Sequence, residues 1–144
     1  MSNAIQNPLV PEEQETLWAV ADVLIPQTAE MPSLRDADPE AVWLARALEA
    51  RSDIVETIKA SLNDLAQVKD LENELIRMRS ESRQTFDDLA SIAAGTYYMV
   101  PRVRELIGYP GQERRPAPVE LAADELSDDI FEGAMAYEGT YREA

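Results

Sequence analysis

The sequence contains no cysteine and no histidine. Without cysteine there is no disulfide framework and no thiolate nucleophile. Without histidine the chain lacks the commonest general base, the commonest metal ligand and any histidine-dependent triad. It also has neither a Gly-x-Gly-x-x-Gly motif nor a phosphate-loop lysine. These absences argue against a stand-alone enzyme, and we expect no catalytic, cofactor-binding or metal-binding residue in this chain.

Basic residues are scarce, with 13 lysines and arginines against 28 acids and a net charge of −15. Nucleic acids and anionic lipids both require a basic face, so this balance disfavours both as partners. No apolar run approaches the ~20 residues that a helix needs to cross a bilayer. We therefore expect no nucleic-acid partner and no membrane insertion.

The N-terminus lacks the features of an export signal. MSNAIQNPLVPEE has no basic region followed by an apolar one, and no twin arginine. The sequence as given is therefore interpreted as cytoplasmic. Ser2-Asn3-Ala4 resembles the remnant of an expression tag, so prior removal of an export segment stays open.

Glycine is also scarce, with five residues and none before Gly95, and no useful β-alternation is present. Apolar residues make up 45% of the 144 residues, enough for one folded domain. The predicted fold is all-α: a compact domain of about five to six helices with an extended acidic C-terminal tail. We expect a flexible N-terminus over 1–10, the helical domain over 11–112, and a proline-containing linker with a docking tail over 113–144.

Proline and acid signals mark the first two predicted helices. Pro11 with acids in the first turn begins one helix, and Pro26 ends it. Residues 27–38 carry no periodic pattern. Asp38 followed by Pro39 is typical of an N-cap with proline at the first helical position, which predicts a helix to about Ala50. Its apolar positions are Val42, Trp43, Ala47 and Leu48.

Helical spacing continues through the middle of the chain. A helix begins at Ser52 or Asp53, and another run of apolar positions follows Asp70; whether 52–79 forms one helix or two stays open. A further helix begins near Ser80 or Ser82 and runs to Tyr98. The inward positions expected of these segments are Ile54, Ile58, Leu62 and Leu65, then Leu71, Leu75 and Met78, then Phe86, Leu89, Ile92 and Ala93.

The stretch GTYYMVPRVRELIGYPGQERRPAP, residues 95–118, holds three of the five tyrosines and four of the nine prolines. Pro101 predicts the start of a short helix, Gly108 its left-handed C′ residue, and Tyr109-Pro110-Gly111 a turn. Tyrosine and arginine are favoured at interfaces, so we interpret the stretch as a recognition surface. The alternative is that the tyrosine pair closes the domain's own core while the arginines neutralise the tail.

Residues 120–144 hold eight acids and one arginine, interleaved with Ile130, Phe131, Met135, Tyr137 and Tyr141. Apolar residues at this density indicate a tail that docks on another surface. The predicted partner-binding residues are Tyr97, Tyr98, Arg102, Arg104, Tyr109, Pro110, Arg114, Arg115, Phe131 and Tyr137.

Three segments together resemble the gluconate 2-dehydrogenase subunit 3 family. GTYYMVPRVRELIGYPGQ is similar to that family's C-terminal signature, ETLWAVADVLIP to its opening helix, and QTFDDLASI to its Phe-x-x-Leu helix. The likeness spans about residues 12–112 and is strongest at its two ends.

The resemblance implies a non-catalytic small subunit of a glucose-methanol-choline-type oxidoreductase. In such complexes the large subunit holds FAD and oxidises an alcohol or sugar, in some cases with a cytochrome subunit as a further partner. The chain departs from exported members because it has no twin-arginine segment, and this fits a cytoplasmic complex. The competing hypotheses are a self-associating regulatory module without a flavoprotein partner and, least favoured, an enzyme that works through carboxylates alone.

Overall fold

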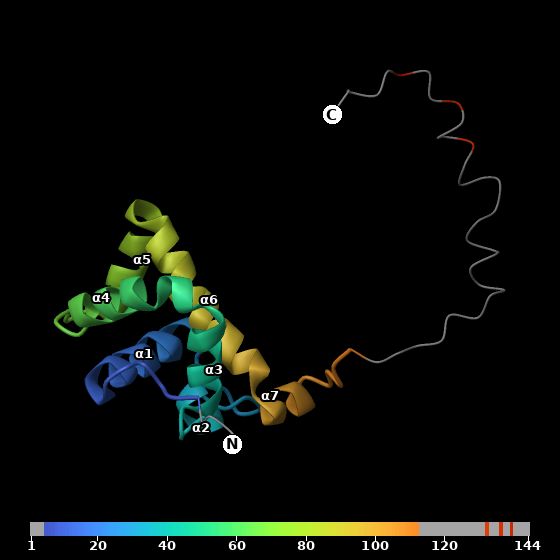
Figure 1. The fold of residues 1–144 in the computed structure, drawn as a ribbon, viewed down its shortest axis with the longest axis horizontal. Helices are drawn as coiled ribbons and strands as arrows, with labels where there is room; N and C mark the ends of the chain where they lie inside the picture. The colour runs from blue at the N-terminus through green and yellow to red at the C-terminus, as the bar shows by residue number, and fades with distance from the viewer. Residues whose placement is uncertain (1–4, 113–131, 133–135, 137–138, 140–144) are drawn as a thin grey trace. The chain divides into compact units, whose positions relative to one another are not determined.

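The computed structural model describes residues 5–112 together with Glu132, Ala136 and Gly139. The chain divides into two units, Met1–Gly111 and Gln112–Ala144, and only the first is described in detail. Within the described residues the fold is all-α, with seven α-helices, one 3-10 turn and no strand (Figure 1). The predicted fold class is confirmed, and the additional helix lies between the first two predicted ones.

Helix α1 spans Pro11–Leu24, as the proline signals predict. Pro11 occupies the first helical position, where a missing N–H costs nothing. The Glu13 carboxylate reaches back to accept the N–H of Val10 at 3.1 Å, which satisfies one donor at the helix start. At the other end, the Ile25 N–H donates to Ala21 O before Pro26.

Helix α2, Leu34–Ala37, falls in the segment where the sequence pattern predicts no helix, so that prediction is wrong. Ser33 caps it, because its Oγ accepts the N–H of Asp36 at 3.1 Å and donates to the Asp36 carboxylate at 2.8 Å. A single turn has too few residues to show a helical period, and its signal is therefore the cap alone.

Helix α3, Val42–Ala50, begins later than predicted, and Asp38 is not its N-cap residue. The carboxylate of Asp38 nevertheless caps the helix from a distance. It accepts the backbone N–H groups of Val42, Trp43 and Leu44 at 2.9–3.0 Å, with Ala41 in the left-handed region at φ 54°. The buried residues of α3 are Leu44, Ala45, Ala47 and Leu48, so of the predicted apolar positions Val42 is exposed and Trp43 half-buried.

Residues 52–81 form two helices, which settles the open alternative. A 3-10 turn over Ser52–Ile54 leads into α4, Val55–Leu65, and α5 follows over Leu71–Glu81. Asp70 starts α5 by accepting the N–H of Asn73 at 3.1 Å. The predicted stripe Ile54, Ile58, Leu62 and Leu65 is buried along its whole length.

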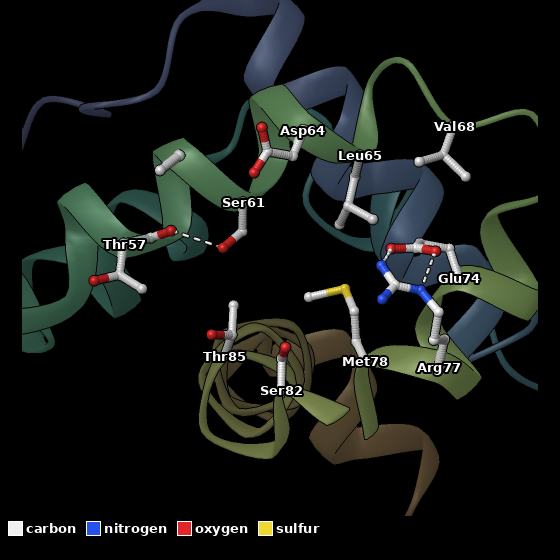
Figure 2. Close-up of a pocket in the computed structure, with 11 residues that line it drawn as sticks. Thr57, Ser61, Asp64, Leu65, Val68, Glu74, Arg77, Met78, Ser82 and Thr85 are labelled. Atoms are coloured by element: carbon white, nitrogen blue, oxygen red, sulfur yellow. Dashed lines mark hydrogen bonds and ion pairs between the residues drawn. The ribbon is translucent and has the colours of Figure 1, made fainter. Parts of the chain in front are cut away.

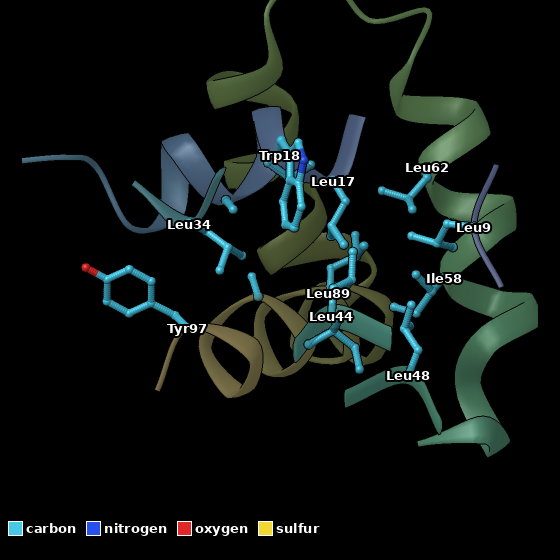
Figure 3. Close-up of a cluster of buried hydrophobic side chains, with 14 of the residues drawn as sticks. Leu9, Leu17, Trp18, Leu34, Leu44, Leu48, Ile58, Leu62, Leu89 and Tyr97 are labelled. Atoms are coloured by element: carbon cyan, nitrogen blue, oxygen red, sulfur yellow. The ribbon is translucent and has the colours of Figure 1, made fainter. Parts of the chain in front are cut away.

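Helix α6, Arg83–Met99, is the longest and runs through the centre of the domain, from α5 at one end to α7, Pro101–Leu106, at the other (Figure 1). It packs against α1, α3, α4 and α5. Its inward residues join those of α1, α3 and α4 in one core, shown in Figure 3 with Leu17, Leu44 and Leu89 near its centre. All seven helices thus contribute buried side chains to one hydrophobic cluster.

Candidate functional site

The tyrosine pair at the end of α6 is divided between the core and the surface. Tyr97 is 2% exposed, and its hydroxyl donates to the backbone oxygen of Pro32 at 2.8 Å. Tyr98 is 53% exposed and meets Tyr97 edge to face, with ring centroids 5.6 Å apart. Successive residues point about 100° apart around a helix, so the two neighbours face different surroundings.

Tyr97 therefore belongs to the chain's own core (Figure 3), and we remove it from the predicted contact residues. Burial raises the pKa of its hydroxyl above the ordinary value of 10.0, because the phenolate would lose its hydration. The alternative prediction, that the pair closes the core, holds for Tyr97 and not for Tyr98. Tyr97 also fastens the segment around Pro32 to the end of α6.

Large apolar side chains gather at the surface just beyond this point. Among the described residues nine large hydrophobic side chains are exposed, and four of these lie between residues 98 and 109. We define the α7 surface as these four together with the nearby cationic and proline residues: Tyr98, Arg102, Arg104, Leu106, Ile107, Tyr109 and Pro110. The residues of this cluster are close together in the sequence. They include Leu106 and Ile107, which are not among the predicted partner-binding residues.

The shortness of α7 explains why so much of it faces outward. Helix α6 ends at Met99, and the extended backbone of its C-cap residue Val100 precedes Pro101, as proline requires. Gly108, at φ 69°, then ends α7 after Leu106, and the N–H of Tyr109 donates to Arg104 O at 2.8 Å. A helix this short turns only one side chain, Val103, fully into the core.

The arginines of the α7 surface differ from most other arginines that the structure describes. Among the described residues Arg102 and Arg104 form no ion pair, whereas the arginines at positions 35, 51, 77 and 83 each meet a carboxylate. Arg102 is exposed and Arg104 half-buried. Their charge is thus open to another molecule.

A shallow groove of about 360 Å³ borders the α7 surface. Arg102 and Leu106 form one wall, and the other comes from the segment 27–32 with Asp36. Met31 and Pro32 give this wall apolar area, while Glu30 adds an acid. The α7 surface therefore combines protruding side chains with an adjoining recess.

Four predicted contact residues, Arg114, Arg115, Phe131 and Tyr137, lie outside the described residues. They stay predictions. Of the others, Tyr98, Arg102, Tyr109 and Pro110 are exposed at the α7 surface and Arg104 is half-buried there.

A second recess, of about 490 Å³, lies between α4 and the junction of α5 with α6 (Figure 2). Ser61, Ser82, Thr85 and Met78 are among the residues that line it. Ser61 donates to the backbone oxygen of Thr57 at 2.8 Å, as serine commonly does within a helix. Among the described residues that line this recess, no hydroxyl is hydrogen-bonded to a carboxylate.

At the edge of this recess one arginine is engaged by two carboxylates. Arg77 binds the carboxylates of Glu74 and Glu81. The guanidinium holds the pKa of Glu74 below its ordinary value of 4.5, chiefly through the hydrogen bond. The recess therefore presents hydroxyls and an ion-paired rim, and no free charge from Arg77.

Within the part of the chain that the structure describes, no group of three acidic, cysteine or histidine residues is arranged to hold a metal ion. Across the same residues, none of the helices has the length and apolar character needed to cross a membrane. Comparisons with protein-family models, curated proteins and solved structures found no match for this chain. The grounds for a functional proposal are therefore the α7 surface and the sequence resemblance.

Proposed function

We propose that this chain is a non-catalytic small subunit that binds and stabilises a larger FAD-dependent oxidoreductase of alcohols or sugars. The flavin and the substrate pocket belong to the larger subunit, and the small chain supports its folding and flavin incorporation. The observation that carries the binding role is the α7 surface. The flavoprotein identity of the partner rests on the sequence resemblance.

The composition of the α7 surface supports a binding role. Exposed apolar side chains scattered singly are normal, whereas a contiguous patch is typical of an interaction site. Tyr98 and Tyr109 each offer a broad ring with a polar tip, and Arg102 offers five donors. Tyrosine and arginine supply the strongest contributions at most protein interfaces.

The use of the buried acids supports a non-catalytic role. Glu13 accepts Val10 N–H and the Asn63 side-chain amide, each at 3.1 Å. Asp38 accepts three backbone N–H groups at the start of α3. A catalytic acid or base must be able to reach a substrate. The oxygens of these carboxylates instead accept hydrogen bonds from backbone and side-chain donors of the chain itself.

The third buried acid, Asp88, has a similar structural role. Its carboxylate accepts the Gln84 side-chain amide at 3.0 Å, and Arg51 lies 3.9 Å away. Together these three buried acids stabilise helix starts and hold neighbouring helices in place. All the buried acids of the described residues thus take part in holding the fold.

Coexpression tests the proposal. The gene adjacent to that of this chain would be expressed with and without it, and the soluble yield, flavin content and activity of the larger product would be measured. We expect a flavoprotein whose yield of soluble, flavin-loaded enzyme falls at least tenfold when the small chain is omitted.

Two results would contradict the proposal. One is a flavoprotein that is soluble, flavin-loaded and fully active by itself. The other is a purified small chain that forms a stable homo-oligomer by light scattering and associates with no flavoprotein, which would favour the self-associating module instead.

A further inference from the structure

Charge is distributed unevenly over the described domain. Residues 5–97 contain 18 acidic and eight basic side chains, a net charge of −10, whereas residues 98–112 contain two arginines and one glutamate, a net charge of +1. The α7 surface is therefore a positive segment on a strongly acidic body. A charge difference of this kind orients a molecule as it approaches a charged partner.

The arginines of this segment have their charge available. Neither Arg102 nor Arg104 forms an ion pair within the described residues, although Glu105 lies between them in the sequence. Residues 102 and 104 are about 200° apart around a helix, so the two cations emerge on different sides of α7. Exposed Leu106 and Ile107 follow one turn later. Apolar area and cations thus alternate around the short helix.

The adjoining groove limits where an anion can bind. Glu30 and Asp36 line the same groove as Arg102. Asp36 is engaged at 2.8 Å by the Ser33 hydroxyl and makes no ion pair with Arg102. The two acids in the groove lining repel a carboxylate that enters the groove. A carboxylate of another molecule therefore meets Arg102 more favourably from outside the groove. Met31, Pro32 and Leu106 leave apolar lining for an uncharged side chain.

We infer that the α7 surface binds a protein face that is apolar at its centre and bordered by carboxylates. This inference rests on the proposed function and names the chemistry by which the larger subunit is recognised. The exposed leucine, isoleucine and tyrosines pack on the apolar centre, and Arg102 and Arg104 meet the carboxylates at its border. The acidic remainder of the small chain is repelled by the same carboxylates, so only one orientation is favoured.

Charge reversal tests this inference with the chain and its copurifying flavoprotein. The double variant Arg102→Glu with Arg104→Glu is compared with Lys69→Glu combined with Arg79→Glu, which changes the net charge equally at exposed positions outside the α7 surface. We expect about 100-fold weaker binding for the first variant. The control pair should change binding by no more than about threefold, and the wild-type affinity should fall as salt rises.

Zero-length cross-linking identifies the facing groups. Arg102→Lys and Arg104→Lys place amines on the α7 surface, and a carbodiimide would join them to carboxylates in direct contact. We expect cross-links to aspartates or glutamates of the flavoprotein, found by mass spectrometry, and none from Lys69. Circular dichroism would check that each variant keeps its helical fold.

The outcomes separate this inference from the proposed function. If no flavoprotein associates, both fail. If it associates but the charge-reversed variant binds like its control, or if the cross-links join the new lysines only to acids of residues 113–144, the function stands and the inference is overturned.

Discussion

The two ends of helix α6 meet their surroundings in different ways. At its start, near α5, Arg77 binds Glu74 and Glu81 and Arg83 lies 3.4 Å from Asp87, while exposed Arg79 forms no ion pair among the described residues. Ile76 is the exposed large hydrophobic side chain of this end. At the other end, near α7, exposed aromatic and aliphatic side chains accompany arginines that have no ion pair among the described residues.

This difference indicates which end of α6 is suited to binding another protein. Paired surface charges contribute little stability and stay hydrated at the surface. Unpaired arginines beside exposed tyrosine and leucine gain more from a partner than from water, because binding removes apolar area from solvent. We therefore interpret the α5 end as a solvent face and the α7 end as a binding face.

The largest effect is expected from charged substitutions at the α7 end, which test whether the two ends of α6 differ in binding. Replacing both exposed tyrosines, Tyr98→Asp with Tyr109→Asp, places unpaired charges in the proposed contact and should weaken binding to the proposed flavoprotein partner by at least about 100-fold. Isothermal calorimetry would measure this. Ile76→Asp at the α5 end is the control and should leave the affinity unchanged. Equal losses for both variants would remove the distinction between the two ends.

The next effect separates the buried tyrosine from its exposed neighbour. Tyr97→Phe removes the hydrogen bond to Pro32 and leaves a carbonyl without its partner, so the free energy of unfolding should fall by about 1–2 kcal/mol. Tyr98→Phe, at an exposed position, should stay within about 0.5 kcal/mol of the wild type. Urea denaturation compares the two, and a reversed order would show that the side chains are misassigned.

A stabilising change is expected within α6 itself. Thr96 is fully buried, and its Oγ1 has no hydrogen-bond partner among the described residues. Thr96→Val keeps the branched shape and removes the unpaired hydroxyl, which should raise the unfolding free energy by about 1 kcal/mol. Thr85→Val, half-buried near the start of the same helix, is the control and should change stability little. A destabilised Thr96→Val variant would indicate a hydrogen bond that the structure does not show.

The smallest effect concerns the paired charges. Arg77 lowers the folded-state pKa of Glu74, so this pair stabilises the fold above the unfolded-state pKa and loses its contribution as pH falls through the folded-state value. Arg77→Met should therefore reduce the loss of stability below about pH 4.5. Thermal denaturation at several pH values would measure this. Arg102→Met, at a residue without an ion pair among the described residues, should leave the profile unchanged.

The elements that the sequence predicts well are those with a long period or a clear boundary residue. Pro11, Pro26 and Asp70 mark real helix boundaries, and the stripe of α4 is buried as expected. The start of α3 is harder to predict, because Asp38 acts across a left-handed residue at Ala41. Such a distant cap depends on backbone geometry that residue preferences do not encode.

The sequence predicts only part of the proposed binding face, because some of its exposure depends on backbone geometry. The inward positions Leu89 and Ala93 lead by one further turn to Tyr97, so the sequence held a signal for its burial. The exposure of Leu106 and Ile107 has no such signal. It depends on the change of direction at Val100 and Pro101, which leaves α7 with a single inward side chain.

Hydrogen exchange, measured on the chain alone and mixed with the proposed flavoprotein partner, would show where the chain makes contact. The account predicts slowed exchange or reduced accessibility over residues 98–110 and the neighbouring segment 27–32, with no change over 71–87. Protection centred on 71–87, or no protection anywhere in 5–112, would contradict it.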